Sequence, residues 1–167
     1  HAIAFDPIVD NKAILHHIVI YSCPVFRNVE YNEEAFECMN LHQDCNNIIV
    51  TWGIGAKGYS FPDEAGMIFG TTESYFGVLE IHYTNNFGLG PQQDESGMRI
   101  FFTPKLRTYD IAIWGFGGAV TGIRLPPGLP SAKHITNCPA DCTQKMDGEE
   151  IKIVSFLLHG HYILNKI

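Results

Sequence analysis

The 167-residue sequence lacks the features of several common functional classes. It has no cluster of lysines or arginines and its formal net charge is −7, so we expect no nucleic-acid partner and no docking on an anionic membrane. Its longest apolar runs, such as 153–158, are far shorter than the about 20 residues that a spanning helix needs. The sequence therefore predicts no membrane-spanning segment.

Markers of the secretory route and of a zinc ribbon are also missing. There is no signal-peptide pattern at the start, which we expect of either a cytosolic protein or a processed or truncated one. There is no Asn-x-Ser/Thr sequon. The cysteines form no CxxC pair, and Cys138 and Cys142 have no second pair to complete a four-cysteine zinc site. Disulfides of a secreted protein fit better, and because the 5 cysteines are odd in number, at least one partner is expected outside these residues.

The sequence does contain many short, strand-like runs. Hydrophobic residues make up 46% and charged residues 17%, which is typical of a globular protein. Runs rich in β-branched and aromatic residues alternate with turn residues such as Pro62-Asp63. The predicted strands cover 2–9, 17–22, 47–52, 65–70, 76–83, 97–103, 110–116 and 150–158, and only 31–43 has a weak helical pattern. This arrangement predicts an all-β, antiparallel sandwich of the jelly-roll type.

Several histidines lie inside these strand-like runs. His16 and His17 are adjacent, and because neighbours on a regular strand point to opposite faces, they can share a metal only if the strand bends or if they bind through different ring nitrogens. His82 lies within the apolar stretch LEIHYTN, where an imidazole needs a partner. His159 and His161 flank one glycine and point to the same face. Three imidazoles from two strands, with no cysteine nearby, suit copper or zinc.

A plainer interpretation competes with this one. A single strand histidine is usually a hydrogen-bonded core residue, although the combination of HH, a lone H and H-x-H is harder to explain in that way. His42 and His134 stand in polar or loop surroundings and are interpreted as surface residues. His1 could chelate copper through its amine and imidazole, as in a histidine brace. A chain that begins within a strand more simply marks where a fragment starts.

A set of motifs resembles one known family. The segments LHHIVIYSC, TWGIGAKGYSFPDEAG, LEIHYTN, SGMRIFFT, LPPG, CPADCTQ and LLHGHY occur in the order found in copper type II, ascorbate-dependent monooxygenases. GAKGYSFPDEAG and LEIHY resemble the branch of dopamine β-hydroxylase, tyramine β-hydroxylase and the monooxygenase-X (DBH-like) proteins more than peptidylglycine α-hydroxylating monooxygenase. The resemblance covers essentially all of 1–167, and the ordered set is far more specific than any single motif.

The resemblance implies two jelly-roll domains that face each other across a solvent-filled cleft, with one copper in each. We expect 1–106 to form most of the first domain and 107–167 to begin the second, with a boundary near 104–109. His16, His17 and His82 are implied as the ligands of the first copper, which stores and passes on the electrons from ascorbate. The protein would be secreted, or lie in a secretory vesicle or the ER lumen, and could form a homodimer.

The second copper, where O2 and substrate meet, is implied to bind His159 and His161. Its third ligand in the family is a methionine that would lie beyond Ile167, and Met146 does not match that position. Residues 1–167 alone are therefore expected to be inactive. Gly160 stands in place of the usual threonine between the two histidines, which loosens the backbone there.

The remaining implied features concern one carboxylate and the cysteines. Glu80 shares the strand face of His82 and is a candidate catalytic residue that points toward the cleft, or else an ordinary solvated carboxylate. A disulfide between Cys23 and Cys45 is implied, whereas the cysteines at 38, 138 and 142 would pair outside this chain.

The function that follows is hydroxylation of an activated C–H bond in a small, aromatic amine-like substrate, with O2 and ascorbate. Two alternatives stay open: a secreted copper-binding or structural relative without catalysis, and a peptidylglycine-type hydroxylase. Presence of the downstream methionine in the whole protein would favour an enzyme, and its replacement would favour the copper-binding relative.

Overall fold

The computed structural model describes residues 1–24, 35, 45, 47–71, 74–117, 124–145 and 150–158, apart from the side chain of Cys142. Its internal contacts divide the chain into two units. The first contains His1–Ile113 and Phe156–Ile167, and the second contains Trp114–Ser155. Among the described residues, all the strands belong to the first unit, and the second carries one helical turn, α1 (Ala140–Thr143).

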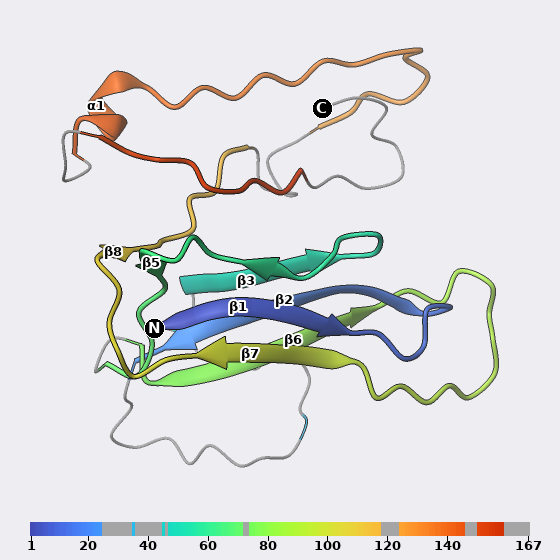
Figure 1. The fold of residues 1–167 in the computed structure, drawn as a ribbon. Coiled ribbons are helices and arrows are strands. Elements are labelled where there is room, and N and C mark those ends of the chain that lie inside the picture. The colour runs from blue at the N-terminus through green and yellow to red at the C-terminus, as the bar shows by residue number, and fades with distance from the viewer. Residues whose placement is uncertain are drawn as a thin grey trace. The chain divides into compact units, whose positions relative to one another are not determined.

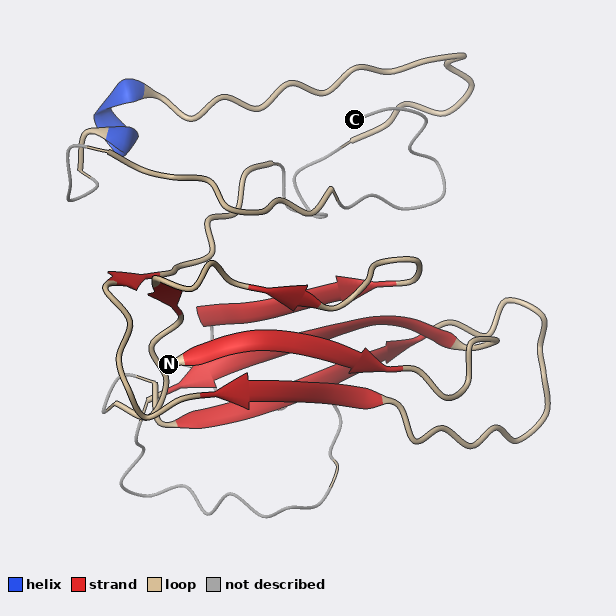
Figure 2. Cartoon of the chain, viewed as in Figure 1, coloured by secondary structure: helices blue, strands red, loops and turns tan. Residues whose placement is uncertain are grey.

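The first unit is built on two three-stranded antiparallel sheets (Figures 1 and 2). In one sheet, β1 (Ala2–Ile8) lies between β4 (Tyr59–Ser60) and β7 (Gly97–Phe102). In the other, β2 (Leu15–Cys23) lies between β3 (Asn47–Gly53) and β6 (Phe76–Tyr83). A short parallel pair joins β5 (Ala65–Gly66) to β8 (Tyr109–Asp110).

Apolar side chains from both sheets form the core between them. One cluster joins β1 to the second sheet, and its buried members are Ala2, Phe5, Ile20, Ile49, Val50 and Met67. The other contains Leu15, Ile18 and Trp52, with Met98 of β7 packed against it. Burial of this apolar surface is the main favourable contribution to folding of such a sandwich. The prediction of an all-β antiparallel fold is confirmed.

Two predicted strands are not formed in the described residues. The run 110–116 contributes only Asp110 to β8, and 150–158 contains no strand. Both runs have the right composition, but a strand also needs a hydrogen-bonded neighbour. Most of their apolar side chains are exposed, as for Ile153, which is 81% accessible. Ile111 is the partly buried exception, and its backbone N–H donates to the Gly66 carbonyl. The domain boundary near 106 stays a prediction.

Smaller differences concern short elements. The predicted strand 65–70 is reduced to the two residues of β5, and neither β4 nor α1 was predicted. The weak helical pattern at 31–43 lies outside the described residues except for Ala35. The five longest strands agree with the prediction to within two residues at each end.

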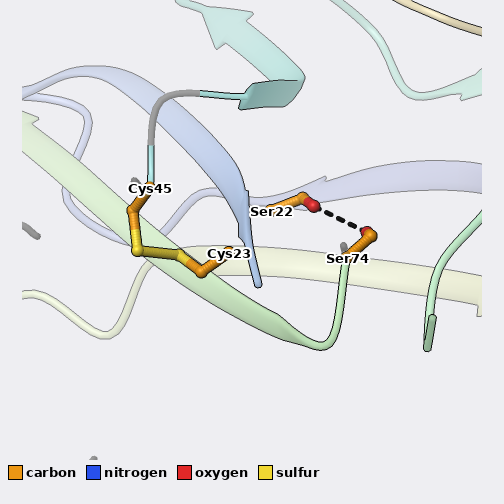
Figure 3. Close-up of a disulfide and its surroundings, with 4 residues drawn as sticks. All are labelled: Ser22, Cys23, Cys45 and Ser74. Carbon is orange, nitrogen blue, oxygen red and sulfur yellow. Dashed lines mark hydrogen bonds between the residues drawn. A yellow bond between two sulfur atoms is a disulfide. The ribbon is translucent and has the colours of Figure 1, made fainter. Parts of the chain in front are cut away.

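A disulfide and a buried hydroxyl pair hold the end of β2 (Figure 3). Cys23, the last residue of β2, is bonded to Cys45, as the resemblance implied. Next to it, the hydroxyl of Ser22 donates a 2.6 Å hydrogen bond to that of Ser74, and both side chains are buried. Cys38 and the Cys142 side chain lie outside the described residues, so the pairing of Cys138 stays a prediction.

At the opposite end of β2, one carboxylate connects the loop after β6 to the turn before β2 by hydrogen bonds. Asp94, in the loop between β6 and β7, accepts hydrogen bonds from the backbone N–H of Asn11 at 2.9 Å, the hydroxyl of Ser96 at 2.7 Å and the hydroxyl of Tyr83 at 3.0 Å. Burial alone would raise the pKa of the Asp94 carboxyl, but these hydrogen bonds outweigh it and lower the pKa below 3.8. Burial, followed by the hydrogen bond to Asp94 and its charge, raises the pKa of Tyr83.

The disulfide should contribute substantially to stability. We expect Cys45→Ala to lower the free energy of unfolding by about 3 kcal/mol. The two cysteines are 22 residues apart, and without the disulfide the loop between them is no longer closed in the unfolded chain. Urea unfolding followed by Trp fluorescence measures this. Wild-type protein under reductant should match the variant, whereas equal unfolding midpoints for oxidised wild type and variant would contradict the prediction.

The Asp94 network should make stability depend on pH in the acid range. Because the folded-state pKa of Asp94 is lowered, its contribution is present above the unfolded pKa of about 4 and is lost as pH falls through the lower folded value. Asp94→Asn should therefore lower stability at pH 7 and flatten its decline below about pH 4. Thermal unfolding from pH 2 to 7 measures both effects. The exposed Asp63→Asn is the matched control, and an unchanged pH profile for Asp94→Asn would contradict the assignment.

Candidate metal centre

A β-bulge in β2 determines where the paired histidines point. Leu15 pairs with Tyr83 and His17 pairs with His82, so between these two pairs β2 has one residue more than β6. That extra residue is His16. A bulge of this kind sets two residues of one strand against one residue of its partner and redirects their side chains. It provides the bend that two adjacent ligands require.

The three imidazoles lie together on the β2–β6 pair. The His16 and His17 ring centroids are 4.7 Å apart, and those of His17 and His82 are 4.0 Å apart. The Nδ1 atoms of His16 and His17 lie 3.2 Å from each other. Two nitrogens bound about 2.0–2.1 Å from one ion at a tetrahedral angle would lie about 3.3–3.4 Å apart. The first two imidazoles thus have the spacing of neighbouring metal ligands.

The third imidazole has the right position but a different orientation. The planes of the His17 and His82 rings differ by only 32°. Ring-nitrogen lone pairs lie in the ring plane, so two stacked rings do not direct them at one point. Accordingly, no group of three or more His, Cys, Asp or Glu side chains encloses a metal position within the part of the chain that the structure describes. The donor set fits copper in type and number, but the His82 ring would have to turn before its lone pair could meet those of His16 and His17.

Glu80 contacts this cluster directly. Its Oε1 atom is the partner of His82 Nε2, and both side chains project from the same face of β6. The Glu80 side chain is 12% accessible and that of His82 40% accessible. Glu80 is therefore a largely buried carboxylate that is paired with an imidazole, not a solvated one.

His1 does not form a histidine brace in this structure. Its amine donates to the Thr103 carbonyl at 2.8 Å, and its Nδ1 accepts from the Arg107 backbone N–H at 2.9 Å, so both atoms that a brace would use are engaged. The imidazole is buried against Gly66, where an added Cβ would come within 2.6 Å of the His1 Cβ. We interpret His1 as a structural residue.

Four further histidines were named from the sequence. His159 and His161, as well as His42, lie outside the described residues. His134 is exposed, as expected of a surface residue. The implied second copper site therefore stays a prediction.

One neighbouring feature was not predicted. A hollow of about 190 Å³ lies beside His16 and is lined by Lys12, Ala13, Leu15, Ile54, Thr84, Asn86 and Phe87. It forms where the turn before β2 meets the residues after β6. These residues are far apart in the sequence, and no local pattern marks them as neighbours.

No described helix combines the length and the hydrophobicity that crossing a bilayer requires.

The chain is similar to one family of known proteins over much of its length. The family model of the copper type II ascorbate-dependent monooxygenase N-terminal domain matches residues 1–89. The dopamine beta-hydroxylase of Canis lupus familiaris is 32% identical over 176 residues, with 100% of this chain and 28% of the relative aligned. DBH-like monooxygenase protein 2 of Mus musculus is 33% identical over 169 residues, with 96% and 27% aligned.

DBH-like monooxygenase protein 1 of Gallus gallus is 30% identical over 174 residues, with 96% of this chain and 28% of the relative aligned. The chain thus spans a little over a quarter of the length of these relatives.

Proposed function

The chain belongs to the copper type II, ascorbate-dependent monooxygenases, and on that premise we propose that His16, His17 and His82 hold one copper ion. The observation that carries this proposal is the bulge at His16, which sets two adjacent imidazoles against the third across the β2–β6 pair. The match to residues 1–89 includes all three histidines.

The donor set suits a metal that changes oxidation state. Imidazole nitrogens are good ligands for both Cu(I) and Cu(II), and no thiolate lies among them to favour Cu(I) alone. When bound, the ion supplies one-electron storage between ascorbate and the site of oxygen chemistry. The chain's own contribution is to hold three nitrogens on one rigid strand pair, at the rim of a hydrophobic core that contains Leu15 and Ile18.

For the whole protein we propose hydroxylation of an activated C–H bond in a small, aromatic amine-like molecule. The relatives named dopamine beta-hydroxylase support this substrate class. The second of two coppers would bind His159 and His161, with a methionine from outside these residues, and would meet O2 and substrate. Separation of the two sites would keep electron storage apart from the oxygen chemistry.

We further propose that the protein functions in a secretory compartment or outside the cell. The Cys23–Cys45 disulfide supports this location, because such bonds persist in oxidising surroundings. Homodimer formation stays a prediction.

Removal of one imidazole should abolish tight copper binding at this cluster. We expect wild-type protein to bind one Cu(II) ion stoichiometrically, and His82→Ala to lower the Cu(II) affinity by more than about 100-fold. Removing a metal ligand should lower the affinity more than removing a residue that only hydrogen-bonds a ligand. Competition with a copper chelator measures the affinity. His134→Ala, which removes an exposed histidine, is the matched control and should bind as wild type does. Equal affinities for His82→Ala and His134→Ala would exclude the proposed site.

The 167-residue chain loaded with copper should accept electrons but not hydroxylate. Ascorbate should bleach the Cu(II) EPR signal of the three-histidine site, whereas no hydroxylated product should form from tyramine or dopamine. The reason is that His159 and His161 supply only two donors to the second copper. Product formation by this chain would show that the oxygen-activating site has been misplaced.

A further inference from the structure

We propose that Glu80 is a positioning residue for the first copper. Glu80 holds His82 in one tautomer, and its negative charge favours Cu(II) over Cu(I). The inference rests on the proposed copper site and assigns a role to a residue that is not one of its three ligands. It begins from the contact between Glu80 Oε1 and His82 Nε2.

Burial gives this contact its weight. The Glu80 side chain is only 12% accessible, and its neighbour across the sheet is the buried Val19. A carboxylate so far removed from water is costly unless hydrogen-bond donors or cations compensate it. In the part of the chain that the structure describes, His82 is the group that does so. The contact with His82 therefore offsets part of the cost of burying the Glu80 carboxylate.

The contact assigns the proton on His82. An ionised carboxylate can only accept hydrogen bonds, so Nε2 must carry a hydrogen. In the neutral imidazole Nδ1 is then left with a lone pair for a metal. Nε2 lies closer than Nδ1 to the axis of the Cβ–Cγ bond. The ring can therefore turn about that bond, as copper binding requires, while Nε2 keeps its contact with the flexible Glu80 side chain.

The charge of Glu80 has a separate effect. A carboxylate that accepts the N–H of a ligating histidine makes the opposite nitrogen a stronger donor. A stronger donor stabilises Cu(II) more than Cu(I), because the higher ionic charge attracts the lone pair more strongly. Glu80 should thus lower the reduction potential of the site and make the reduced ion a better electron donor.

Two substitutions separate orientation from charge. Glu80→Gln keeps an acceptor oxygen and the shape of the side chain but removes the charge, whereas Glu80→Leu removes both. Glu64→Gln removes a charge from an exposed glutamate and is the matched control. On the full chain we would measure Cu(I) and Cu(II) affinities by chelator competition, and the His82 tautomer in metal-free protein by ¹⁵N NMR. Thermal unfolding verifies that each variant is folded.

Glu80→Gln should leave Cu(I) affinity within about threefold of wild type and lower Cu(II) affinity about tenfold. For a one-electron couple, a tenfold rise in the ratio of Cu(I) affinity to Cu(II) affinity raises the reduction potential of the site by about 59 mV. Glu80→Leu should weaken binding of both ions 10- to 100-fold and release the His82 tautomer. Glu64→Gln should change none of these quantities. If Glu80→Gln preserves both affinities and the His82 tautomer is mixed in wild type, the proposal is overturned. Should Glu80→Leu not fold, Glu80→Gln and the wild-type spectrum decide alone.

Failure of the copper site itself would have a different signature. If wild type binds no copper at the cluster, or if His82→Ala does not change the copper affinity, the proposed copper site is wrong. The proposed role of Glu80 toward copper is then wrong as well. A single Nε2–H tautomer of His82 in metal-free wild type, lost in Glu80→Leu, would then show that the contact is structural only.

Discussion

The candidate site depends on one irregularity in strand pairing, the extra residue that β2 carries between Leu15 and His17. In a regular antiparallel ladder, side chains alternate between faces, so adjacent histidines could not both approach a third on the neighbouring strand. The bulge removes this restriction at one position and leaves the ladder intact on either side. A single inserted residue thus converts a sequence of two histidines into a pair of neighbouring donors.

The rest of the first unit holds this irregularity in place. Ile18, one residue after the paired histidines, is fully buried with Leu15 and Trp52, which sets the face that β2 turns toward the core. At the far end of the strand the Cys23–Cys45 disulfide limits its movement. At the near end, Asp94 ties the loop after β6 to the turn before β2. Because both ends are fixed, a shift in register would disrupt many contacts at once.

Three features of this strand pair bear on the proposed electron-storing copper. The three imidazoles are alike and come from one strand pair, so a copper held by them would change its oxidation state with little rearrangement of the chain. Glu80, which lies on the same strand, contacts the His82 ring that would have to turn for metal binding. The hollow of about 190 Å³ lies beside His16.

The order of the motifs was enough to identify the family, and the local pattern was enough to predict the longest strands, including β6 with both of its ends. It also marked His16, His17 and His82 as unusual. The bulge, the Glu80–His82 contact and the Asp94 network were decided only by the tertiary structure. The runs 110–116 and 150–158 show the same limit, because their strand-like composition did not produce strands. Side-chain spacing along one strand is a local property that the sequence contains. Register and pairing are set by the neighbouring strand, so they follow from contacts between residues far apart in the chain.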